Sequence, residues 1–184
     1  MTKEALIADR RAFVFPIGLN QFWERDPKTG QYNWRLRPGL LNTGETPTRR
    51  LRFYVDCEFR NSPLPENFQF IDGPARPGKG FLGPKATLYG GLAPQLQNAA
   101  LSPQDLHDII NGRKYVYLWG WIRYFDVFPG TPEHITRFCW QILVTGDPFK
   151  FVPGQVPQQD PDNLNFSYLQ TAQGNCADEE CFRK

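Results

Sequence analysis

The chain contains two histidines, and one of them lies close to acidic residues in a pattern that could support hydrolysis. Asp126 ends one apolar segment, and Glu133 and His134 begin the next, around a turn at 128–132. A histidine that takes up a proton while a carboxylate orients its ring is a common general base of hydrolases. The sequence has no nucleophile-elbow motif, however, and a structural role at a strand end or on the surface explains His107 and His134 more simply.

Arginines in the predicted strands form a second candidate site, for an anionic partner. If the outer faces of their strands adjoin, the guanidinium groups would make a positive surface with Tyr and Trp nearby. Such a surface could hold an anionic ligand, an acidic protein segment or the chain's own acidic residues 178–180, but a solvated charged face is the plainer explanation. The net charge of +2 does not predict nucleic-acid binding. The candidate residues are Arg35, Arg37, Arg50, Arg52, Arg123 and Arg137.

The four cysteines are Cys57, Cys139, Cys176 and Cys181. Strand periodicity places Cys57 on a buried face and Cys139 on an outer face. A disulfide needs Cα atoms within about 7 Å of each other, so a bond between these two is disfavoured. A bond from Cys139 to Cys176 or Cys181 is favoured instead, and four free thiols in a reducing compartment are the alternative. The sequence contains no CxxC pair, so a zinc site is not predicted. It also contains no motif that predicts a cofactor.

Alternating apolar and charged residues predict the elements that would position these groups. Residues 50–60 show the pattern most clearly, with Cys57 on the apolar side and Asp56 and Glu58 on the side expected to face solvent. Ser102 followed by Pro103 is typical of the start of a helix, with Ser as the N-cap and Pro at the first helical position, and predicts a short helix over 103–111. Together with the strand that includes residues 50–60 and spans 48–60, strands are predicted near residues 11–19, 32–37, 83–90, 114–127 and 134–145. The segment 114–127 is apolar on both faces and is therefore expected to be central.

These elements predict an all-β protein, an antiparallel β-sandwich with immunoglobulin-like topology, and a small barrel is the alternative fold. We expect residues 1–150 to form the sandwich. Residues 151–184 carry a net charge of −3 and are rich in Pro and Gln, so we expect an acidic tail that packs on the sandwich or extends from it.

Four short stretches resemble a family of uncharacterised bacterial membrane-anchored proteins: residues 4–6 followed by 11–15, then 42–47, 126–134 and 176–181. The resemblance implies a β-sandwich domain that follows one or two transmembrane helices, at the cell envelope. No apolar run in this chain approaches the roughly 20 residues that span a bilayer, so we expect the anchor to lie outside this sequence. The family has no assigned activity or functional residues to transfer.

The sequence therefore favours a non-catalytic binding or accessory domain, with a protein or an anionic ligand as its partner. Two alternatives stay open. One is a hydrolase that uses Asp126 and His134, with Glu133 nearby, and the other is an oligomerising structural domain.

Overall fold

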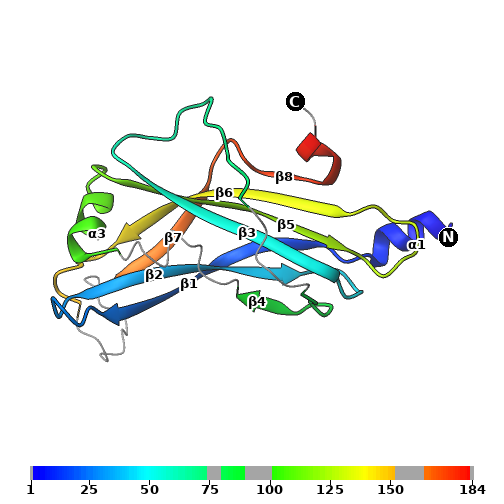
Figure 1. Ribbon diagram of the computed structural model, residues 1–184, viewed down its shortest axis with the longest axis horizontal. Coiled ribbons are helices and arrows are strands. Elements are labelled where there is room, and N and C mark those ends of the chain that lie inside the picture. Colours follow the sequence, from blue (N-terminus) through cyan, green and yellow to red (C-terminus); the bar gives the residue numbers. More distant parts are fainter. Residues whose placement is uncertain (1, 74–79, 90–100, 152–163, 183–184) are drawn as a thin grey trace.

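The computed structural model describes residues 2–73, 80–89, 101–151 and 164–182. Figure 1 shows two antiparallel sheets stacked face to face, with one helix at each end of the stack. The predicted all-β sandwich is confirmed, and its immunoglobulin-like topology stays a prediction. Within the described ranges, no helix combines the length and the apolar character needed to cross a membrane.

The smaller sheet contains β1 (Val14–Arg25), β2 (Tyr32–Asn42) and β4 (Thr87–Tyr89), in the order β1-β2-β4. β1 and β2 form a long hairpin whose turn is held by the Asp26 carboxylate, which accepts the Lys28 backbone N–H at 2.7 Å. The sequence suggests that Pro38-Gly39 interrupts this ladder. The extra residue lies instead in the facing strand, at Gly18, whose φ of +49° suits glycine.

The larger sheet is built around β5 (Tyr115–Phe125), which is covered by protein on both faces, as predicted. Its neighbours are β3 (Arg49–Arg60) and β6 (His134–Thr145), and β7 (Asn165–Gln170) extends the sheet beyond β6. The two-residue strand β8 (Cys176–Ala177) also pairs with β6, alongside the start of that strand.

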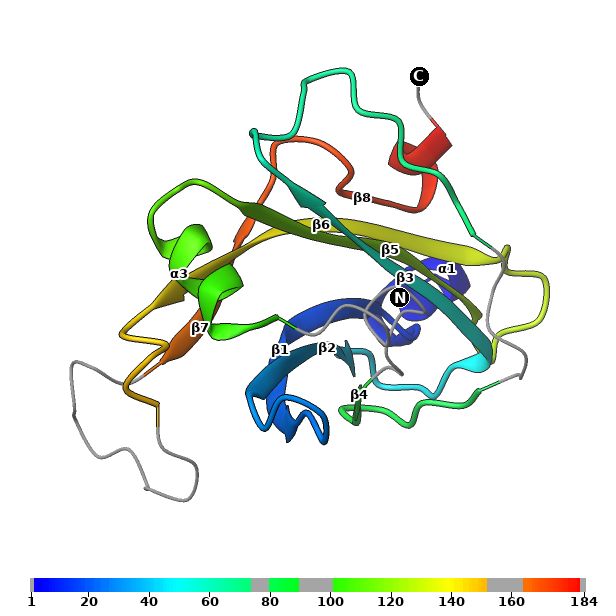
Figure 2. The same cartoon turned by 60° about the vertical axis from the view of Figure 1, so that its left-hand side comes forward.

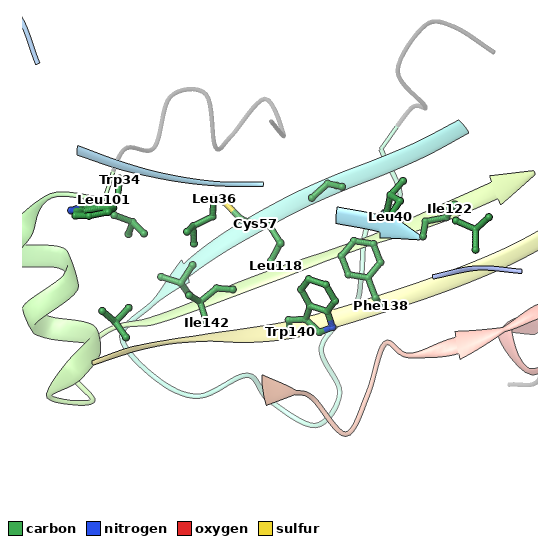
Figure 3. Close-up of a cluster of buried hydrophobic side chains, with 14 of the residues drawn as sticks. Trp34, Leu36, Leu40, Cys57, Leu101, Leu118, Ile122, Phe138, Trp140 and Ile142 are labelled. Atoms are coloured by element: carbon green, nitrogen blue, oxygen red, sulfur yellow. The ribbon is translucent and has the colours of Figure 1, made fainter. Parts of the chain in front are cut away.

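The core fills the space between the sheets (Figure 3). Side chains alternate along each strand, so the even-numbered residues of β5 and β6 point to the same side. Leu118, Phe138 and Trp140 are at most 3% exposed and face Leu36 and Leu40 from β2. Burial of this apolar surface is the main stabilising term of the fold.

The outer face of the larger sheet is also covered over part of its area, and this corrects the prediction that Asp56 faces solvent. Residues 61–73 fold back over it, so that a Cβ at Gly73 would lie 2.2 Å from the Tyr54 ring. Asp56 is 9% exposed and accepts the Tyr54 hydroxyl proton at 2.6 Å. The alternation identified the outer face, but it could not show that a loop covers it.

Two helices lie at opposite ends of the sandwich (Figure 1), and Figure 2 shows the larger sheet above the smaller one. The predicted helix is confirmed as α3 (Pro103–Ile110), and Ser102 caps it by accepting the Asp105 backbone N–H at 3.1 Å. At the other end, α1 (Lys3–Arg10) precedes β1, and Thr2 caps it. The 3₁₀ helix η1 (Asp178–Phe182) follows β8.

Part of the segment expected to be an acidic tail belongs to the sheet. Among residues 164–182, β7 and β8 form backbone pairs with β6, and Leu164 is 5% exposed. The predicted Pro- and Gln-rich stretch at 152–163 lies outside the described residues.

Candidate functional site

Asp126 and His134 meet in the structure, at the end of the sandwich nearest α1. Tyr124 in β5 pairs with His134 at the start of β6, and the turn between these strands brings Asp126 onto the histidine ring. The distance from Asp126 Oδ2 to His134 Nε2 is 3.1 Å. His134 begins β6, as the strand-end interpretation expects, but both residues are buried, at 1% and 3% exposed, and form a buried pair.

The second ring nitrogen of His134 is bonded to Asp178 in η1. Both carboxylate oxygens of Asp178 lie 3.2 Å from His134 Nδ1. The same carboxylate accepts hydrogen bonds from the Arg11 guanidinium and from the Ile135 backbone N–H, each at 3.1 Å. We call Arg11, Asp126, His134 and Asp178 the histidine cluster. It joins the end of α1, the β5–β6 turn and the C-terminal segment.

Asp126 is itself held in place by its own turn. Its Oδ1 accepts the Phe128 backbone N–H at 2.8 Å and the Thr131 hydroxyl at 2.6 Å. An Asp that bonds the backbone two residues ahead is typical of a tight turn. The turn 126–131 therefore fixes the carboxylate that meets His134.

The contacts of the histidine cluster set its charges. The hydrogen bond to Asp178 raises the pKa of His134, and the bond to Asp126 adds to this effect, although burial opposes both. Burial alone would raise the pKa of each carboxyl group, but bonds from Thr131 and His134 lower that of Asp126, and the bond from His134 lowers that of Asp178. The two carboxylates favour the protonated ring, in which one N–H would point to each of them, whereas the Arg11 guanidinium, 3.2 Å from His134 Nδ1, opposes protonation.

This geometry suits a structural clamp better than a general base. A base needs an unprotonated nitrogen that can reach a substrate, and both nitrogens of His134 are bonded. Glu133 lines the same opening, of about 540 Å³, as Asp126 and His134, but its carboxylate is bonded to Arg52 and lies 3.8 Å from Arg123. In the described part of the chain, no group of three or more His, Cys, Asp or Glu side chains is placed to hold a metal ion.

The predicted bond from Cys139 to Cys176 or Cys181 is wrong. Cys176 and Cys181 bond to each other and close a short loop that contains Asp178. Cys139 is a free thiol that is fully buried, because residues 61–73 pack over it. Cys57 is also free and buried.

The six candidate arginines do not form one surface. Arg35 and Arg37 lie on β2 of the smaller sheet, and the other four belong to the larger sheet. Opposite residues of an antiparallel pair share a face. Arg52 lies opposite Arg123, so the two guanidinium groups share the outer face of the larger sheet. Arg137 lies on that face too, opposite Trp121, and Arg50 lies at the bulge that begins β3.

Most of these arginines already have partners within the chain. Arg137 makes a two-pronged bond to Asp72, at 2.7 and 2.6 Å, and Arg35 bonds Glu24 at 2.7 Å. The Arg50 guanidinium lies over the Phe125 ring, with its Cζ 5.9 Å from the ring centre, and that of Arg37 lies 5.1 Å from the ring centre of Phe22. Paired, partly exposed charges of this kind match the simpler interpretation, a solvated charged face.

A groove of about 410 Å³ opens at the edge of the sandwich where β1 meets β6, β7 and β8. We call it the edge groove. The Tyr168 ring stacks on Trp140 with 4.1 Å between ring centres, and the rings of Phe138 and Trp140 are 5.2 Å apart. Its volume falls in the range of roughly 300–1,000 Å³ that is usual for small-molecule sites. Its aromatic lining residues are Phe13, Phe15, Phe138, Trp140 and Tyr168.

Side-chain bonds fix the width of the edge groove. The Val14 backbone N–H donates to the Tyr124 hydroxyl at 3.2 Å, and the Thr136 hydroxyl donates to the Val14 carbonyl at 2.7 Å. Farther along β1, the Gly18 N–H donates to the Tyr168 hydroxyl at 3.2 Å. Because these bonds run through side chains, β1 stays farther from the larger sheet than a paired strand would, which leaves the groove open.

Two polar side chains of the edge groove have no partner within the described ranges. Gln170 and Glu180 line the groove, are exposed, and make no hydrogen bond or ion pair there. The Asn175 side chain, by contrast, has partners for both its oxygen and its nitrogen. Its oxygen accepts a hydrogen bond from the Cys139 N–H at 2.9 Å, and its nitrogen donates to the Thr171 carbonyl at 2.8 Å.

Neither the edge groove nor the role of Asp178 was predicted from the sequence. The alternation placed Phe138 and Trp140 on an inward face, which is correct, but it gave no sign that part of this face stays uncovered. Asp178 was noted only as an acidic residue of the tail, and its contact with His134 spans 44 residues.

Comparison with known proteins identifies no relative. No protein-family model matches the chain, no curated protein matches it, and no solved structure matches its fold.

Proposed function

We propose that this chain is a non-catalytic binding domain whose ligand occupies the edge groove. The observation that carries the proposal is the groove itself, an opening of about 410 Å³ lined by five aromatic side chains and bordered by two polar side chains that have no partner among the residues the structure describes. Ligand sites are typically concave and mostly aromatic or apolar, with a few polar groups that fix orientation.

The histidine cluster supports a binding role over hydrolysis. Its His134 nitrogens are both bonded to carboxylates, and its Asp126 is held by its own turn. A protonated ring in this arrangement stabilises the fold and has no proton-accepting atom left for a substrate.

We further propose that the domain works at the cell envelope, as part of a membrane-anchored protein. The Cys176–Cys181 disulfide supports this location, because disulfides persist mainly in oxidising compartments. Its loop also carries Glu180, which borders the edge groove, so an oxidising compartment would keep one wall of the groove in place.

A groove-filling variant tests the proposed function. Ala177 lines the groove from β8, and A177W would place an indole within it. A172W is the matched control, because Ala172 is exposed and lines a separate opening of about 470 Å³, so a compound that binds there would be lost in A172W and kept in A177W. We expect a small-molecule fragment library, screened by ligand-observed NMR, to contain compounds that bind the wild type and A172W but not A177W. The proposal is wrong if no compound binds, or if every bound compound also binds A177W.

A further inference from the structure

We infer that the edge groove binds a pyranose ring of a saccharide, an inference that rests on the function proposed above. The aromatic side chains supply the apolar part of such a site. One face of a pyranose ring presents C–H groups, and these pack favourably on the electron-rich face of an aromatic ring. Tyr168 is the most accessible of these residues, at 39% exposed, and it lies on the stacked Trp140.

The polar groups around the rings match hydroxyl groups, which both donate and accept hydrogen bonds. The Glu180 carboxylate offers two hydrogen-bond acceptor oxygens. The Gln170 amide offers an acceptor oxygen and an N–H₂ donor. The Trp140 indole N–H has no acceptor among the described side chains and backbone. The Tyr168 hydroxyl accepts from Gly18 and keeps its own proton to donate.

Charge argues against ionic ligands. An organic ammonium would use the Glu180 carboxylate and the aromatic rings, but it would leave the hydrogen-bond donors of the groove unused. An anion would meet Glu180 without a free cation among the described residues that line the groove, because the Arg137 guanidinium is bound to Asp72. A neutral polyhydroxylated ring fits both constraints.

The test uses variants of the two unpartnered residues, with neighbours as controls. E180A and Q170A each remove a group that bonds a hydroxyl, and the matched controls E179A and L169A alter exposed neighbours that lie outside the groove. The probes are an array of immobilised glycans, soluble oligosaccharides of glucose and of N-acetylglucosamine, and choline as the ammonium probe. Binding of the soluble probes is followed by isothermal calorimetry.

We expect at least one glycan to bind, and E180A to weaken it about tenfold or more, as for the loss of a bond to a charged group. Q170A should weaken it severalfold, E179A and L169A should bind as the wild type does, and E180Q should keep most of the affinity. Binding to the immobilised glycans alone would indicate that the ligand is a polymeric glycan. Binding to the soluble oligosaccharides as well would indicate that a short saccharide chain is enough, and both results support the inference.

Choline binding that E180Q abolishes, or no glycan binding, would overturn it. If fragments still bind the wild type and not A177W in that case, the proposed function survives and only the ligand class is wrong.

Discussion

Below about pH 6.5, where its raised pKa keeps the His134 ring protonated, replacing His134 by Gln should destabilise the fold strongly, because it removes the cation between two carboxylates. In H134Q, the Asp126 and Asp178 side chains would face an uncharged amide, and each would lose its charged hydrogen-bond donor. Breaking a buried ion pair by removing one partner costs about 3–5 kcal/mol. The total free energy of unfolding of a domain is only about 5–15 kcal/mol, so the effect should be large.

The effect of H134Q should also depend on pH. The pKa of His134 is raised in the folded state, so its stabilisation is complete below about pH 6.5 and is lost as the pH rises through the raised value. The pKa values of Asp126 and Asp178 are lowered, so their stabilisation is present above about pH 4 and is lost as the pH falls through the lowered values. The difference between wild type and variant should therefore be largest between about pH 4 and pH 6.5.

Urea unfolding of both proteins at about pH 5.5, 7 and 8.5 measures this difference. The second histidine provides the control, because the His107 side chain is 41% exposed on α3 and H107Q should change the unfolding free energy by less than about 0.5 kcal/mol. The reasoning would be refuted if H134Q lost less than about 1 kcal/mol at the lowest pH, or if the difference grew as the pH increased.

Three further predictions concern the cysteines and a buried amide. Reducing the Cys176–Cys181 bond should lower the free energy of unfolding by about 2 kcal/mol, measured by urea unfolding with and without a phosphine reductant. Cys57 and Cys139 should not react with a thiol reagent at about pH 8 until the protein unfolds, because burial raises the pKa of their thiols to about 12 and about 11; a thiol titration of native and unfolded protein checks this. N42A should lower the free energy of unfolding by about 3 kcal/mol or more, measured by calorimetry, because the Asn42 amide is 0% exposed and bonds the backbone of several neighbouring segments.

Each of these predictions has a contrary outcome. Unchanged stability on reduction would mean that the contacts of Asp178 hold the C-terminal loop without the disulfide. Rapid labelling of native protein would mean that the loop over Cys139 opens readily. N67A is the control for N42A, because Asn67 is exposed in a loop, and it should lower the free energy of unfolding by less than about 0.5 kcal/mol. If N42A lowered the free energy of unfolding no more than N67A does, the stabilising role of the buried Asn42 bonds would be contradicted.

The sequence predicted those features of the fold that local periodicity determines. Alternation identified the strands of the core and the inward direction of Phe138 and Trp140, because a strand's side chains have a fixed period of two. The apolar stretch 114–127 was predicted to be central, and β5 lies between β3 and β6. Ser102 and Pro103 predicted α3 because capping depends on adjacent residues.

Features that depend on distant contacts were not predictable in this way. The pairing of Cys176 with Cys181 follows from the path of the C-terminal segment, and the partners of His134 follow from the meeting of both chain ends. β7 was missed because it is an edge strand with mostly exposed side chains, which removes the apolar alternation. The edge groove arises from the spacing between β1 and β6, a property of tertiary packing.

Protein-observed NMR on ¹⁵N-labelled protein distinguishes a binding groove from a catalytic histidine in one sample. The two reporters are the indole N–H of Trp140 in the edge groove and the ring nitrogens of His134 in the histidine cluster. During titration with a ligand found by the fragment or glycan screen at about pH 5.5, below the ordinary pKa of histidine, we expect the Trp140 signal to shift with occupancy. Both His134 nitrogens should remain protonated and unshifted. A ligand that shifts the His134 nitrogens and leaves Trp140 unchanged, or a His134 ring with one unprotonated nitrogen, would contradict the account.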